Sequence, residues 1–214
     1  MYKHPLLNRD KMSPQEALDI LIEGNHRFRN DMEEDKDFKS LLHITKEKQH
    51  PFASFLSCSD SRAPVELLFD QALGDIFSVR LAGNIASDKA IGSIEFSTKY
   101  LGAKLIVVMG HTDCGAVKAA CDDFKDGHIG EIVNLIKPAI RYEKTVTNKA
   151  DRRSSNPDFV EKINVLNVKS QINTIVRASD IIDDMLQAHQ VGIIGAVYDI
   201  ATGKVNFLQE TLVL

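Results

Sequence analysis

Short apolar runs alternate with amphipathic stretches along most of this chain. Runs such as Ile106-Val107-Val108 are continuous and β-branched, which is typical of strands buried on both faces of a parallel sheet. A polar turn at residues 201–204 precedes a further run, residues 205–208, which we expect to form an edge strand. The runs that predict the buried strands lie at residues 53–57, 76–81, 105–110 and 192–198.

Between these runs, and before the first of them, apolar residues recur at helical spacing. The segment Ser13-Pro14-Gln15-Glu16 has the form of a capping box, so a helix is predicted to begin there and to end near Arg29. A second helix is expected at residues 38–49, because Pro51 disfavours helix in the residue before it. Further helices are predicted at residues 87–101, 115–124, 131–142, 157–178 and 180–189.

The alternation of strands and helices predicts one α/β domain with a mainly parallel central sheet flanked by helices. An N-terminal helical arm, residues 1–50, and a C-terminal edge strand complete it. A chain of 214 residues is long enough for one sizeable core and short for two full domains. Because the first helix precedes every strand, we expect the arm to pack on a partner subunit.

Composition and charge exclude several classes of protein. A formal net charge of -4 provides no general attraction to nucleic acid or to anionic lipid. No apolar stretch approaches the ~20 residues that a membrane-spanning helix needs. Residues 1–8 contain no apolar core of signal-peptide length, so a cytoplasmic location is the default expectation. Three cysteines, an odd number, argue against a disulfide framework and favour metal binding or catalysis.

Candidate chemistry follows directly after two of the predicted strands. The first run ends in Cys58-Ser59-Asp60-Ser61-Arg62, and the third ends in His111-Thr112-Asp113-Cys114-Gly115. Ligand sites in open α/β sheets lie at the carboxyl ends of the strands, so these two segments are expected to meet. Two thiolates and one imidazole match a catalytic zinc site with one open position. Soft thiolates also disfavour magnesium, calcium and manganese.

Asp60 and Arg62 give this predicted site an asymmetry that a structural metal site would not need. In an extended path they point to the same side as Cys58, since side chains alternate along a strand. The carboxylate can ligate zinc or accept a hydrogen bond from a water on the metal, and the guanidinium can hold it in a bidentate pair. The alternative is an ordinary salt bridge at the end of a strand, worth about 1 kcal/mol or less if exposed.

These segments closely resemble the two signature motifs of the β-class carbonic anhydrases. Residues 74–80 and Ala82-Gly83-Asn84 match further family segments in the same order, and the resemblance extends from about Gly24 to Gly203. It implies that Cys58, His111 and Cys114 ligate Zn²⁺. It also implies that Asp60 and Arg62 form a catalytic dyad, with Asp60 able to occupy the fourth zinc position in an inactive form.

The same resemblance implies a reaction and a substrate site. The reaction is the reversible hydration of carbon dioxide to bicarbonate and a proton, by attack of zinc-bound hydroxide that the Asp-Arg dyad orients. Gln49 falls where many members bind bicarbonate, and Phe77 and Phe96 fall at positions near the carbon dioxide pocket. Phe55 replaces the Trp of the subgroup with a non-catalytic bicarbonate site, which argues against that regulation. A homodimer or homotetramer is expected.

Three other interpretations stay open at this point. Proteins with resembling folds also hydrolyse carbonyl sulfide or carbon disulfide, and the sequence does not show the width of an access route. A structural metal site would need four firm protein ligands. A nucleophilic Cys58 beside His111 would need a third residue that orients the pair, and none is evident.

Overall fold

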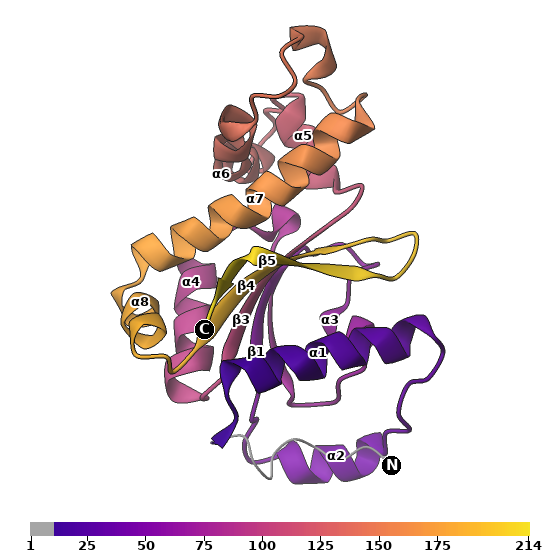
Figure 1. Ribbon diagram of the computed structural model, residues 1–214, viewed down its shortest axis with the longest axis vertical. Helices are drawn as coiled ribbons and strands as arrows, with labels where there is room; N and C mark the ends of the chain where they lie inside the picture. The colour runs from indigo at the N-terminus through magenta and orange to yellow at the C-terminus, as the bar shows by residue number, and fades with distance from the viewer. Residues whose placement is uncertain (1–10) are drawn as a thin grey trace.

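The computed structural model describes residues 11–214, and the first ten residues of the predicted N-terminal arm lie outside the described residues. Five strands form one sheet with helices on both faces, in the order β2-β1-β3-β4-β5 (Figure 1). The first four strands are parallel, and β5 runs antiparallel to β4. The predicted α/β fold is therefore confirmed. The strands are β1 (Ala53–Ser57), β2 (Ile76–Arg80), β3 (Leu105–His111), β4 (Gly192–Tyr198) and β5 (Val205–Val213).

Helices occupy most of the remaining described chain, and none of those in residues 11–214 is both long and apolar enough to cross a membrane. Three further helical segments are short, namely η3 (Ala82–Asn84), η4 (Phe96–Tyr100) and η5 (Lys149–Asp151). The α-helices are α1 (Pro14–Arg29), α2 (Phe38–Thr45), α3 (Val65–Leu68), α4 (Asp88–Glu95), α5 (Gly115–Cys121), α6 (Ile129–Tyr142), α7 (Pro157–Ala178) and α8 (Asp180–Gln187).

Two predicted helices differ from the structure at their carboxyl ends. The helix expected at residues 38–49 stops at Thr45, because the four residues that follow are polar and offer no apolar face to pack. The helix expected at residues 87–101 is α-helical only to Glu95 and then widens into the π-helical η4. Within η4 the buried Ser97 hydroxyl donates to Ser54 Oγ of β1 at 2.8 Å, a contact that ties the wider turn to the sheet.

The edge strand was predicted too short. It was expected at residues 205–208, but β5 continues to Val213. Its last residues, 209–213, begin with three polar residues and are all at least partly exposed, which suits a strand at the edge of the sheet. The single turn α3 was not predicted either, because four residues are too few to show helical periodicity.

Alternate residues of β3 fill two separate cores, one on each face of the sheet. On one face Val107 and Met109 pack in the same cluster as Leu18 and Leu21 of α1. On the other face the alternate β3 residues pack with Ile172 and other residues of α7. Burial on both faces fixes the register of the strand, since a slip by one residue would exchange the faces.

The N-terminal arm has two parts with different surroundings. The helix α1 packs on the sheet of its own chain, and Arg27 near its end forms an ion pair with the buried Asp70 at 2.5 Å. The shorter α2 exposes Phe38, Leu42 and Ile44, each by more than half. Packing of the arm on a partner subunit stays a prediction, and these exposed residues are its best candidates for contact.

The buried Asp75 gives the stability of the fold a predictable pH dependence. Burial raises the pKa of Asp75 to about 7, although Oδ2 accepts a hydrogen bond from the Ala72 N–H at 2.8 Å. As pH rises from about 4 to about 8, the unfolded chain therefore loses this proton first, and the free energy of unfolding should fall by on the order of 4 kcal/mol.

An Asp75→Asn variant should lack this decline, because the amide resembles the protonated carboxyl group. Urea unfolding at several pH values measures the free energy of unfolding of both proteins. The two should be similar near the acidic end, and the variant should be the more stable above neutrality. Parallel curves for the two proteins would show that Asp75 does not titrate in this range.

Candidate metal centre

Three side chains that are far apart in sequence converge at one point. A sulfur atom of Cys58, a ring nitrogen of His111 and the sulfur atom of Cys114 all lie within 4.8 Å of one another. All three residues are buried, with no side chain more than a few per cent exposed. Together they form the ligand cluster, the term used below for these three residues.

The parallel pairing of β1 and β3 brings the cluster together. Ser57 at the end of β1 lies opposite Met109, so Cys58 follows one strand where His111 ends its neighbour. Cys114 then occupies the N-cap position of α5, after a tight turn from β3. The carboxyl ends of two adjacent strands thus supply all three ligand atoms. This was predicted from the position of the two segments directly after two apolar runs.

The chemistry and spacing of these atoms fit zinc. Two thiolates at about 2.3 Å from a tetrahedral zinc ion lie about 3.8 Å apart, and the two Sγ atoms are 4.0 Å apart here. The buried Nε2 atom of His111 has no hydrogen-bond partner among the described residues, as expected of a metal ligand. Its Nδ1 lies 2.9 Å from the Thr112 carbonyl oxygen, which favours the tautomer with a proton on Nδ1 and a free lone pair on Nε2.

The two thiols affect each other strongly. The hydrogen bond from Cys114 stabilises the thiolate of Cys58 and is the main cause that lowers the pKa of Cys58. The same pairing, together with burial, raises the pKa of Cys114. Two buried sulfurs that share one proton can exchange that proton for a metal cation. A divalent metal ion then neutralises both thiolates.

Arg80 at the end of β2 and Gly83 in η3 hold the segment that carries Cys58. Arg80 donates from Nε to the Cys58 carbonyl oxygen at 3.1 Å and from Nη2 to the Asp60 carbonyl oxygen at 2.5 Å. Gly83 donates its N–H to the Cys58 sulfur at 3.4 Å. Gly83 has φ of +73°, and a Cβ there would lie 2.7 Å from Ile136 Cδ1, so any other residue would be strained in this turn. The sequence placed Arg80 in a predicted strand, but did not show which atoms it contacts.

Asp60 and Arg62 form a bidentate pair beside the cluster. Arg62 donates from Nε to Oδ1 at 2.9 Å and from Nη2 to Oδ2 at 2.8 Å. This pairing holds the pKa of the Asp60 carboxyl group well below its usual range. Oδ2 lies 3.8 Å from Nε2 of His111, so an ionised carboxylate faces the ligand cluster. The side chain of Arg62 is half exposed, so the pair lies on the side of the ligand cluster that faces solvent.

The other predicted site residues lie elsewhere in the chain. Gln49 is exposed and precedes β1, whereas Cys58 follows that strand, so the five residues of β1, about 17 Å in length, separate them. Phe77 lies opposite Ser54 near the start of β1 and packs against Phe96, with 6.4 Å between the ring centroids. Within one chain, therefore, Gln49, Phe77 and Phe96 are not beside the ligand cluster.

Fold and site together define a class of protein. Structural zinc sites use four protein ligands, whereas catalytic sites use three and leave one position for water or substrate. The cluster provides three ligands, and the carboxylate of Asp60 beside it is held by Arg62. The class is an α/β zinc enzyme.

Comparisons with known proteins agree with this class. A family model described as carbonic anhydrase matches residues 53–205. A carbonic anhydrase of Mycolicibacterium smegmatis is 32% identical over 91% of this chain and 93% of its own length. A β-carbonic anhydrase of Coccomyxa, solved with acetazolamide, has a TM-score of 0.70 at 26% identity and covers 89% of this chain and 86% of its own. A tetrameric β-carbonic anhydrase of Sordaria macrospora has a TM-score of 0.68 at 25% identity and covers 79% and 90%.

The chain belongs to the β-class carbonic anhydrase family. It is a carbonic anhydrase, a lyase that interconverts carbon dioxide and bicarbonate. The cluster of Cys58, His111 and Cys114 is typical of the zinc site of this family.

The three cysteines of the chain allow a matched test of the cluster. Cys114→Ser should lose most of its zinc, because a serine hydroxyl is a poor ligand for this metal. Cys121→Ser is the control, since this half-buried thiol lies on the same helix, outside the cluster, and burial raises its pKa to about 12. Elemental analysis of the purified variants measures zinc per chain. Full zinc in the Cys114 variant would contradict the assigned ligand.

Proposed function

We propose that Cys58, His111 and Cys114 hold zinc while Asp60 and Arg62 orient the water that attacks carbon dioxide. The observation that carries this proposal is the ionised Asp60 carboxylate, with Oδ2 at 3.8 Å from Nε2 of His111 and both oxygens held by Arg62. Zinc, when bound, acidifies the attacking water, whose pKa falls from ~15.7 towards ~7.

The chain's own residues then have separate tasks. The carboxylate of Asp60 accepts a hydrogen bond from the attacking water and so directs a lone pair of that water towards the carbon of the substrate. Arg62 keeps Asp60 ionised and binds both of its carboxylate oxygens, which leaves the fourth metal position to water. Arg80 fixes the main chain at Cys58 and Asp60 together, so the ligand and the orienting carboxylate keep a constant separation.

A second copy of the chain is proposed to complete the substrate site. Gln49, Phe77 and Phe96 lie away from the cluster of their own chain, and β2 is an edge strand among the described residues. Phe96 is half exposed, and the neighbouring Tyr100 is two-thirds exposed. A homodimer or homotetramer formed across this aromatic edge would cover these rings and bring them to the site of the partner, where Gln49 would donate to bicarbonate.

Stopped-flow measurement of carbon dioxide hydration tests the activity directly. Zinc should be determined on the same sample, so that turnover is expressed per metal. Turnover on carbonyl sulfide and carbon disulfide, measured in parallel, separates hydration from hydrolysis of these gases. Absence of hydration by a zinc-loaded sample at every pH would overturn the proposed function.

Replacement of Asp60 by asparagine separates orientation of water from binding of metal. Asp60→Asn should keep its zinc and lose about 10²-fold or more in kcat, because general-base residues contribute about 10²–10⁴-fold. Asp123→Asn is the control, since this exposed carboxylate pairs only with surface lysines among the residues described here. Stopped-flow assays across pH measure both variants. Near-normal turnover of the Asp60 variant would contradict the assigned role.

The aromatic edge makes a prediction about assembly. Phe96→Ser should shift the protein towards monomers and reduce kcat/KM, since it removes apolar surface from the proposed interface and from the substrate site. Phe124→Ser is the matched control, because Phe124 is similarly exposed and lies beyond α5. Light scattering measures the mass of each variant. If both variants keep the oligomer of the parent protein, this edge is not the interface.

A further inference from the structure

The long helix α7 contacts the turn that carries two of the three metal ligands. The buried Asn164 donates from Nδ2 to the main-chain carbonyl oxygen of His111 at 2.5 Å. One helical turn earlier, Glu161 Oε1 accepts the main-chain N–H of Asp113 at 3.0 Å. The same Nδ2 atom lies 3.4 Å from Glu161 Oε2, so the two side chains also bind each other. We call Glu161 and Asn164 the α7 pair.

The turn between His111 and Cys114 needs such support. Asp113, its third residue, has φ of +60°, a left-handed conformation that costs free energy for a residue other than glycine. A change in this conformation would rotate Cys114 relative to His111. Asn164 also packs closely on the strand before the turn, where a Cβ on Gly110 would lie 2.6 Å from its Oδ1 atom. The α7 pair therefore holds the turn by two hydrogen bonds, one to the carbonyl of His111 and one from the N–H of Asp113.

The carboxylate of Glu161 is well suited to this task. A charged acceptor forms a stronger hydrogen bond with a main-chain N–H than a neutral one does. Its second oxygen orients Asn164, so one charge fixes both contacts. We propose that Glu161 and Asn164 are positioning residues that hold His111 and Cys114 in the arrangement that binds zinc. The inference rests on the proposed ligand set, to which it adds two residues that do not touch the metal.

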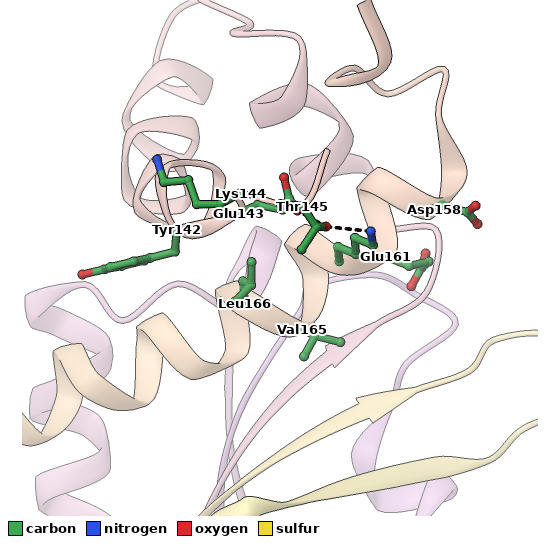
Figure 2. A pocket seen from close by; sticks show the side chains of 9 residues that line it. Tyr142, Glu143, Lys144, Thr145, Asp158, Glu161, Val165 and Leu166 are labelled. Atoms are coloured by element: carbon green, nitrogen blue, oxygen red, sulfur yellow. Dashed lines mark hydrogen bonds between the residues drawn. The ribbon is translucent and has the colours of Figure 1, made fainter. Parts of the chain in front are cut away.

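The outer side of Glu161 is accessible. Glu161 lines an open cavity of about 730 Å³ between the end of α6 and α7, together with Tyr142, Leu166 and other residues. Figure 2 shows the Glu161 carboxylate turned away from Tyr142 and Leu166. Its neighbour Lys162 takes a different direction and donates to Thr145 Oγ1 at 2.8 Å. A substitution of Glu161 therefore changes the turn without opening a cavity in the core.

The release of zinc measures this positioning role without relying on activity. Zinc-loaded protein is mixed with an excess of a chromophoric chelator, and the rate of colour formation gives the dissociation rate. Glu161→Ala should release zinc about tenfold or more faster than the parent protein, since residues that orient metal ligands contribute about 10–100-fold to metal affinity. Glu161→Gln keeps an oxygen acceptor for the Asp113 N–H and should give an intermediate rate.

Cobalt substitution provides a second measurement. The absorption bands of thiolate-bound cobalt report the arrangement of the ligands, and they should shift in Glu161→Ala and return towards the parent spectrum in Glu161→Gln. A merely structural role for Glu161 would lower the unfolding temperature but would not move these bands. Thermal unfolding of each variant is recorded alongside, so that loss of fold is distinguished from loss of positioning.

Asp158→Asn is the matched control. It removes the same charge one helical turn before Glu161, from an exposed side chain outside the α7 pair. Its zinc release and cobalt spectrum should equal those of the parent. Parent-like values for Glu161→Ala, or an equal change in Asp158→Asn, would overturn the inference. Absence of zinc from the parent protein itself would instead overturn the ligand set, and the inference with it.

Discussion

The register between β1 and β3 is the constraint on which the site depends. Ser57 lies opposite Met109, so the chain leaves both strands at the same level of the sheet. A slip of one residue would turn Cys58 to the other face and remove it from His111. The two cores prevent this slip, because alternate residues of β3 are buried on opposite faces. Packing far from the metal thus determines whether the three ligands can meet.

Around the ligand cluster, side chains from other elements bind main-chain groups of the two segments that carry the ligands. Arg80 binds two carbonyl groups of the segment with Cys58, and the α7 pair binds a carbonyl and an N–H of the segment with His111. Asp60, by contrast, is held through its carboxylate by a half-exposed arginine. The ligand-bearing segments are therefore held through their main chain, while the orienting carboxylate is held by Arg62.

Much of the fold and of the ligand cluster could be predicted from the sequence. Buried parallel strands show as continuous apolar runs, and the positions of Cys58 and His111 after two such runs implied that they meet. The edge strand was predicted too short because residues after Leu208 face solvent and lose the apolar pattern. The α7 pair was not predicted, since a side chain that binds a distant main-chain atom leaves no periodicity. Contacts across subunits are equally invisible in one sequence.

The separation of the ligands along the chain has a consequence for folding. Cys58 and Cys114 are 56 positions apart, and the pairing of β1 with β3 brings both to one point. This differs from a zinc finger, whose ligands lie close together in sequence and whose metal organises a short segment. Here zinc would cross-link two ends of a long loop that strand pairing brings together. Metal uptake by a newly synthesised chain would therefore report that its central strands have paired.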